Sequence, residues 1–216
     1  MNKIIIEDSN INDFNIEKGN ECIYNLINEK DCNNSLVFNL DNNSSAKINI
    51  FDASKNTKRT ITINLNGTNS SVVLNLSVLS LGENNYEVNI NHNNKNTNSS
   101  SNLHGLALKD NKIYFKNNGT IKHGSSKSDL QQDNKIIIMD DNDSKIEPNL
   151  FIDEYDISAS HGAYVGKFKE EDIFYLKTRG LSEEDSYNLL INGFLFGDFD
   201  IDEKDNLTKI VDRYRG

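Results

Sequence analysis

Cysteine, proline and tryptophan are scarce or missing in this sequence of 216 residues, which has two cysteines, one proline and no tryptophan. The two cysteines, Cys22 and Cys32, match no zinc-binding spacing and make at most a thin disulfide framework. A reduced chain is the simpler interpretation, and it is typical of a cytoplasmic protein. The sequence also lacks an apolar run long enough to span a bilayer, because its most apolar stretch, Ser71 to Gly82, alternates with Asn and Ser.

The sequence also has few basic residues: 33 acidic residues outnumber 23 basic ones and give a net charge of −10. A duplex nucleic acid or an anionic membrane surface would need Lys and Arg to neutralise its phosphates. We therefore expect neither nucleic acid nor a membrane as a partner. The N-terminal run MNKIIIEDSN is too short, and too acidic after its isoleucines, for a secretory signal, so we expect a cytoplasmic protein.

What the sequence has in excess is asparagine, at about one residue in six. From about Asp31 to Asp156, short runs of alternating apolar and polar residues recur every ~10–13 residues between clusters of turn-forming residues. This spacing predicts an all-β sandwich, barrel or solenoid and does not choose among them. Runs such as Ile61 to Leu65 place Asn or Thr on one face and aliphatic residues on the other, an alternation that a solenoid needs and that a sandwich shares.

After about Lys169 the pattern becomes helical. The segment Lys169 to Gly180 begins with acids, ends with basic residues and stops at glycine, which is the order that a helix dipole favours. Ser182, with Asp185 three residues later, predicts the capped start of a second helix. A third helix is predicted from apolar residues at helical spacing, namely Leu207, Ile210, Val211 and Tyr214. We place the single proline, Pro148, in a connection near the end of the β region.

Three segments, in order, resemble the C-terminal part of the SufB/SufD family of iron–sulfur cluster assembly proteins. The run QDNKIIIMDD, Gln132 to Asp141, is similar to the last core strand of that family, which opens with a Gln. The run SKIEPNLFIDEYDISASHGAYVG is similar to the family's next β-helix turn, and IFYLKTRGLSEEDSYNLLINGFL to its helical close. The Ser-His-Gly-Ala form is closer to the SufD branch than to SufB.

The resemblance implies a right-handed parallel β-helix with a small C-terminal α-helical subdomain, and so it selects the solenoid among the open alternatives. We expect the β-helix core over residues 1–167 and the ATPase-docking helical subdomain over residues 168–216. Family members carry a further N-terminal helical region. We therefore expect a shortened, SufD-like member that lacks it.

The family implies a scaffold that is not an enzyme. Two such subunits pair through their β-helices, either with a SufB/SufD-like partner or with a second copy, and their C-terminal helices dock a SufC-type ABC ATPase. A nascent iron–sulfur cluster, transient and shared with the partner subunit, is expected at their interface. The alternative is a free-standing β-helix that binds carbohydrate or acts at a surface, but the absence of tryptophan and of an export signal counts against it. A β-helix lyase or hydrolase would need convergent carboxylates in one cleft, whereas the acids here are scattered.

His161 is the candidate metal ligand, because a neutral imidazole binds iron and the matching family histidine lies at the subunit interface. Ser160, Gly162 and Gln132 are the other cluster and interface candidates. A histidine that only hydrogen-bonds backbone at the end of the solenoid is the competing interpretation. Where SufB has a cysteine shortly after the Gln, this chain has none, so a SufB-like partner is expected to supply the thiolate.

The resemblance also places the ATPase-docking surface on the C-terminal helices. Most apolar side chains there must be core, because three short helices are unstable unless each buries one face. The candidate docking residues are Phe174, Tyr175, Leu176, Arg179, Gly180, Leu190 and Phe194. His92, His104 and His123 share no ligand spacing, and we interpret them as structural or surface residues.

Overall fold

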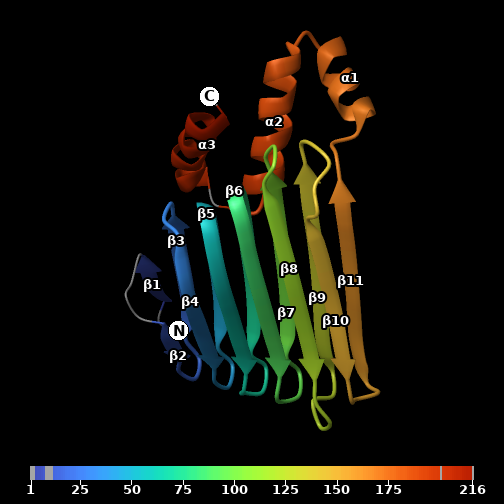
Figure 1. The fold of residues 1–216 in the computed structure, drawn as a ribbon. Coiled ribbons are helices and arrows are strands. Elements are labelled where there is room, and N and C mark those ends of the chain that lie inside the picture. The colour runs from blue at the N-terminus through green and yellow to red at the C-terminus, as the bar shows by residue number, and fades with distance from the viewer. Residues whose placement is uncertain (1–2, 8–11, 200, 216) are drawn as a thin grey trace.

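The computed structural model describes residues 3–7, 12–199 and 201–215. Its strands wind into a β-solenoid of about six turns, and three helices follow near the C-terminus (Figure 1). Every strand pair in these described residues is parallel. The predicted solenoid is therefore confirmed over the sandwich.

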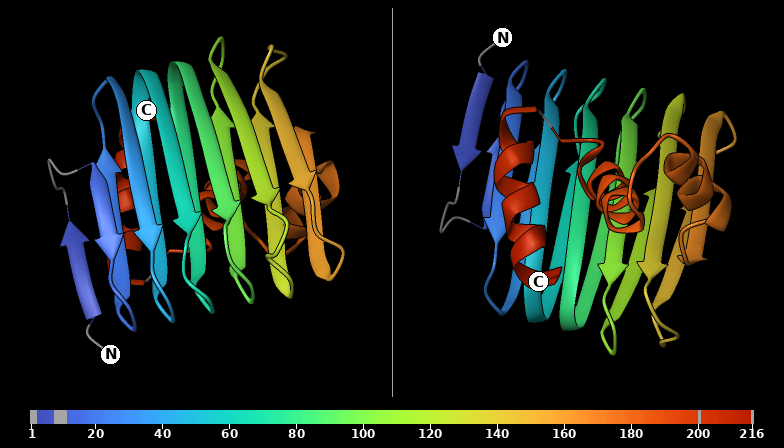
Figure 2. Two further views of the ribbon diagram at one scale, coloured as in Figure 1. Left: turned by 90° about the horizontal axis from the view of Figure 1, so that it is seen from below. Right: turned by 90° about the horizontal axis from the view of Figure 1, so that it is seen from above.

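The coils present two long faces; Figure 2 shows the solenoid from below and from above the view of Figure 1. One face contains β1 (Lys3–Glu7), β3 (Glu21–Asn28), β5 (Ser45–Leu65), β6 (Ser71–His92), β7 (Asn98–Ala107), β9 (Ser128–Ile138) and β11 (Ile157–Gly166). The other contains β2 (Asp13–Ile16), β4 (Cys32–Leu40), β8 (Lys112–Ile121) and β10 (Lys145–Ile152), with the second halves of β5 and β6 between β4 and β8. Both of those long strands thus serve two faces.

Strand register fixes the length of a coil. Glu21 lies beside Ser45, and Asn98 lies beside Asp129, so a coil from β2 onward takes between 24 and 31 residues, whereas Lys3 on β1 lies beside Glu21, 18 residues later. The shorter runs visible in the sequence are therefore half-coils, two to a turn. The sequence shows no strict repeat because the coils differ in length while keeping the same inward and outward alternation.

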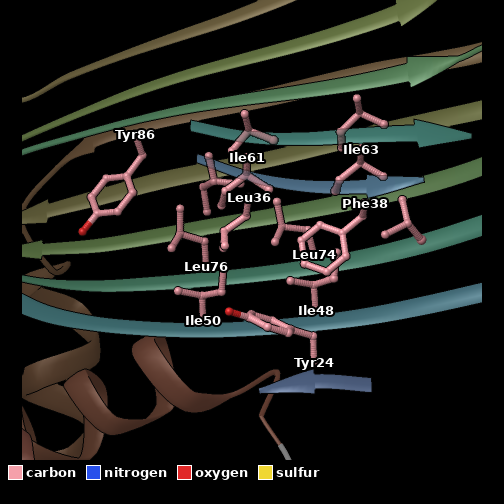
Figure 3. Close-up of a cluster of buried hydrophobic side chains, with 14 of the residues drawn as sticks. Tyr24, Leu36, Phe38, Ile48, Ile50, Ile61, Ile63, Leu74, Leu76 and Tyr86 are labelled. Carbon is pink, nitrogen blue, oxygen red and sulfur yellow. The ribbon is translucent and has the colours of Figure 1, made fainter. Parts of the chain in front are cut away.

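Side chains that point into the solenoid stack in columns from coil to coil. In one column Phe14, Phe38, Ile63 and Ile90 occupy successive coils, and each is at most 5% exposed. The rings of Phe14 and Phe38 stack with their centroids 4.7 Å apart. Figure 3 shows the neighbouring aliphatic and tyrosine side chains that fill the same interior. Burying each such side chain stabilises the fold by about 1.5–3 kcal/mol.

Asparagine is used for two structural purposes. At one turn of successive coils a residue adopts a left-handed conformation, and these residues are Gly19, Asn43, Asn69, Asn96 and Lys127. Asparagine tolerates this conformation better than most residues with a side chain. Asparagines also form ladders between coils, in which each Nδ2 donates to the Oδ1 of the preceding coil; one ladder contains Asn25, Asn49, Asn75 and Asn102.

The three predicted helices are present as α1 (Glu170–Thr178), α2 (Glu183–Phe196) and α3 (Ile201–Arg215). The predicted cap of α2 is confirmed, since the Ser182 hydroxyl accepts the backbone N–H of Asp185 at 3.0 Å. A second core joins α2, the loop after it and α3 to the solenoid; it contains Phe51, Ala53, Leu79, Leu106, Ile137, Ile191, Leu195, Phe196, Phe199, Leu207, Ile210 and Val211. None of the helices, within the residues described, is long and apolar enough to cross a membrane.

Two local expectations are wrong. Pro148 lies inside β10 rather than in a connection, and β10 tolerates it because this strand is at the edge of its face, where a missing N–H leaves no ladder bond broken. Gln132 does not open its strand, since β9 begins four residues earlier at Ser128, and two further strands follow it.

Candidate functional site

The site begins with an open end of the solenoid. Among the described strands β10 pairs only with β8, and β11 pairs only with β9, so each is the edge of its face (Figure 1). An edge strand carries backbone N–H and C=O groups that no neighbouring strand has bound. This end can therefore accept further strands.

Apolar side chains at this end are left partly uncovered. Ile152 lies beside Ile121, one coil further in, and the two are 40% and 0% exposed. Val165 lies beside Ile136 with the same contrast, 40% against 0%. Phe151 is 56% exposed. The columns that end at Ile152 and Val165 are buried inside the solenoid and thus reach the surface here, where another coil or another subunit would cover them.

His161 lies on this open end, in the middle of β11. Its Cα is in register with that of Gln132 on β9, so both side chains belong to the inward-facing set of the coil. The imidazole is exposed and has no hydrogen-bond partner within the described part of the chain. Ser160 and Gly162 flank it and are also exposed, whereas Gln132 is only 4% exposed.

Beneath β10 and β11 the interior becomes polar. Asn117 donates to the Asn134 side-chain carbonyl at 2.8 Å and to the Ser101 hydroxyl at 3.0 Å. Asn134 in turn donates to the Gly162 carbonyl at 3.0 Å, and Gln132 Nε2 donates to the Asn117 backbone carbonyl at 3.2 Å. We call these four residues, Ser101, Asn117, Gln132 and Asn134, the amide network. It connects the core directly with the strand that carries His161.

The residues predicted to dock the ATPase fall into two groups. Phe174 and Tyr175 on α1 are 69% and 55% exposed, and α1 buries none of its residues. Arg179 lies over the Tyr175 ring, with 5.2 Å between guanidinium and ring centroid, and Gly180 ends the helix at a φ of +93°. We call these four exposed residues, Phe174, Tyr175, Arg179 and Gly180, the exposed tip of α1; this helix lies on the opposite side of α2 from α3 (Figure 1).

The other group is tied into the fold. Leu176 and Leu190 are partly buried, and Phe194 stacks on the His104 ring with 4.8 Å between centroids. Phe194 also joins the second core beside Phe168. The structure therefore separates these three from the exposed tip.

His104 is a residue whose position the sequence did not indicate. It lies on β7 under α2, where Nδ1 is 2.9 Å from the Phe194 carbonyl and Nε2 is 3.8 Å from an Asp133 carboxylate oxygen. Burial lowers the pKa of His104, against the opposing effects of Asp198 and Asp133. Asp133 is 29 residues and Phe194 is 90 residues further along the chain than His104. No local sequence pattern could therefore predict this contact between the solenoid and α2.

A complete metal site is not found within the described residues, where no three His, Cys, Asp or Glu side chains gather. Cys22 is buried in β3, and burial raises the pKa of its thiol. Cys32 lies on β4, where its sulfur is 3.2 Å from Arg59 Nη2. Both cysteines belong to coils near the opposite end of the solenoid from His161 (Figure 1). Within the described residues, His161 therefore has neither cysteine near it.

Comparison with known proteins gives one family. The model of the SufBD core domain of the SUF system of FeS cluster assembly matches residues 7–194. The iron–sulfur cluster assembly protein SufD of Bacillus subtilis is 33% identical over 93 residues, 43% of this chain and 21% of the relative. SufD of Escherichia coli is 35% identical over 71 residues, 32% of this chain and 16% of the relative. A SufBD family protein of Pyrococcus horikoshii is 50% identical over 44 residues, 20% of this chain and 9% of the relative. The matched segments thus span about a fifth or less of these relatives.

Proposed function

Because this chain belongs to the SufBD core family of the SUF iron–sulfur cluster assembly system, we propose that it is a SufD-like scaffold subunit without catalytic activity of its own. It pairs with a SufB/SufD-like subunit or a second copy through the open end of its solenoid. Its C-terminal helices dock a SufC-type ABC ATPase in the cytoplasm. In this proposal residues 1–167 are the pairing body, and residues 168–216 are the docking subdomain.

The observation that carries the pairing proposal is the open end itself. Ile152, Phe151 and Val165 are each at least 40% exposed, beside two strands whose outer edges are unpaired. Exposed apolar side chains beside free strand edges favour association through added strands. A partner that continues the coil would bury these side chains and bind the edge backbone together.

The docking proposal is supported by the exposed tip of α1. Phe174 and Tyr175 are large aromatic side chains that the fold leaves uncovered. Aromatic and arginine side chains are enriched where interfaces derive most of their binding energy, and Arg179 lies beside Tyr175 here. The second core holds α2 and α3 on the solenoid, so movement of a docked ATPase would be transmitted to the coils.

His161 is proposed as one ligand of the cargo cluster. Iron–sulfur clusters are normally held by thiolates, and both cysteines of this chain lie in distant coils. The remaining ligands must therefore come from the paired subunit. A cluster shared across the interface would then be released when the interface is reshaped.

The test is assembly with the cognate ATPase and a SufB-like subunit. Co-expression followed by affinity purification and gel filtration should give a stable complex. After anaerobic reconstitution with iron and sulfide, His161→Ala should retain the complex and lose cluster absorbance. The absence of any complex would contradict the proposal. Binding to a carbohydrate array without ATPase binding would favour a sugar-binding β-helix instead.

A further inference from the structure

The interior of the solenoid changes character directly beneath its open end. Asn134 lies beside Leu103 of the previous coil on its face, and Asn117 lies beside Val88. Apolar residues in one coil are thus replaced by buried amides in the next. Asn117 and Asn134 are each 0% exposed, so these amides are core residues and not a polar rim.

The amide network makes bonds to both edge strands. Asn134 Nδ2 donates to the Gly162 carbonyl of β11 at 3.0 Å, one residue after His161. Gln132 Nε2 reaches the Asn149 carbonyl of β10 at 3.5 Å. Because these bonds go to backbone carbonyls, the network fixes the edge strands whatever side chains they carry.

One acceptor of the network is unused. Gln132 Oε1 is buried and has no hydrogen-bond partner among the described residues. A buried carbonyl oxygen without a donor is unfavourable. His161 is in register with Gln132 and belongs to the same inward set, so a change of rotamer is the movement that would bring its ring to this oxygen. Histidines that bind metals commonly donate their second ring N–H to such a carbonyl.

We propose that Gln132 and Asn134 are positioning residues for His161, with Asn134 holding the strand at Gly162 and Gln132 Oε1 accepting one imidazole N–H. The other ring nitrogen then faces outward as a lone-pair donor. The function of this contact rests on the proposed ligand role of His161. The contact itself is argued from strand register and hydrogen bonds and does not depend on that role. Gln132 and Asn134 would thus orient His161 in addition to filling the core.

The tautomer of His161 tests the Gln132 contact. In ¹⁵N-histidine-labelled protein at pH 8.5, the tautomers of the imidazole are distinguished by long-range ¹⁵N–¹H spectra. We expect wild-type His161 to depart from the tautomer ratio of free histidine, and Gln132→Met to restore that ratio. Identical tautomer ratios in the two proteins would overturn the contact.

Hydrogen exchange tests the Asn134 contact. Asn134→Leu should raise the exchange rates of the β11 amides around Gly162 about fivefold or more, because a strand-fixing bond is lost. Asn84→Leu is the matched control, since Asn84 is 1% exposed and bonds to Ser54 in a distant coil. Equal exchange of β11 in both variants would overturn the positioning role.

These outcomes are separable from the proposed function. His161→Ala assigns the resonance and measures the loss of cluster after reconstitution. If that variant holds a cluster as well as wild type does while Gln132→Met shifts the tautomer, the ligand role fails and the positioning contact stands. If the tautomer is unchanged while His161→Ala loses the cluster, the reverse holds.

Discussion

At the scale of single residues, the imidazole of His92 is fully enclosed in the solenoid. It is 0% exposed, with Nδ1 2.7 Å from the Thr97 hydroxyl and Nε2 2.8 Å from the Ser99 hydroxyl. Hydroxyl groups donate or accept as required, so both ring nitrogens are satisfied while the ring is neutral. Burial lowers the pKa of His92 to about 4. Protonation would put an unpaired charge in the core.

The free energy of unfolding should therefore decrease as the pH falls and His92 becomes protonated in the unfolded chain. The unfolded chain binds this proton below about pH 6.5 and the folded chain only near pH 4, so the free energy of unfolding decreases between these values, by up to about 3 kcal/mol. Urea unfolding at pH 7.5, 6 and 4.5 measures it. His92→Gln is the control, because it should be less stable at pH 7.5 but show a flatter decline. Parallel declines in both proteins would contradict the assignment.

At the scale of elements, the turns explain much of the asparagine. Asn43, Asn69 and Asn96 occupy the same left-handed position in successive coils, and Lys127 takes it in the next. The backbone N–H at each of these positions donates to the neighbouring turn, as Asn96 does to the Ser126 carbonyl at 2.9 Å. The conformation is therefore fixed by bonds between coils, and the residue present must accept it. Lysine accepts it at a higher conformational cost than asparagine does.

Lys127→Asn should stabilise the protein by about 0.5–1 kcal/mol, because the left-handed strain is reduced while the inter-coil bond is kept. Thermal and urea unfolding measure the gain. Lys122→Asn is the matched control, since Lys122 is also an exposed lysine between β8 and β9 but lacks a positive φ. Equal effects of the two substitutions would indicate a charge effect and not a backbone effect.

The exposed tip of α1 gives a second test at this scale. Phe174→Ser with Tyr175→Ser should change the free energy of unfolding by less than about 0.5 kcal/mol, because neither side chain is buried. The same pair should weaken binding to the SufC-type ATPase by about tenfold or more, measured by titration calorimetry. Ile27→Ser, at another exposed apolar residue, controls for surface polarity. Undiminished ATPase binding would exclude the tip as the docking surface.

Local patterns predicted the alternation of the strands, the Ser182 cap and the three helices, because each depends on neighbours in sequence. The bend inside β5 was not predicted, since the chain turns its corner near Ser54 to Asn56 without a turn cluster. The composition gave no hint of the amide network, because Asn117 and Asn134 look like ordinary turn formers until register places them in the core. The position of His104 under α2 likewise depends on tertiary packing alone.

At the scale of the whole molecule, a solenoid differs from a closed globule because each coil is buried only by its neighbours. The coils of β5 and β6 have neighbours on both sides, while β10 and β11 have one each. The helices cover the rim of the solenoid beside Phe51, Leu79 and Leu106 and leave the open end uncovered (Figures 1 and 2). The helices thus cover one side of the solenoid, while the outer edges of β10 and β11 stay unpaired among the described strands.

A charge placed on the open end should therefore prevent pairing without unfolding the chain. Val165→Lys should lower affinity for the SufB-like subunit, or for a second copy, by about a hundredfold, because the lysine would be buried in the pair without a partner. Its melting temperature as a monomer should stay close to that of wild type. Val73→Lys is the matched control, since Val73 and Val165 are 39% and 40% exposed but Val73 lies on a strand paired on both sides. Sedimentation velocity measures the pairing of both variants, and thermal unfolding measures their melting temperatures. If Val73→Lys loses pairing while Val165→Lys keeps it, the open end is not the interface, and the subunits pair through the face of the solenoid that carries Val73.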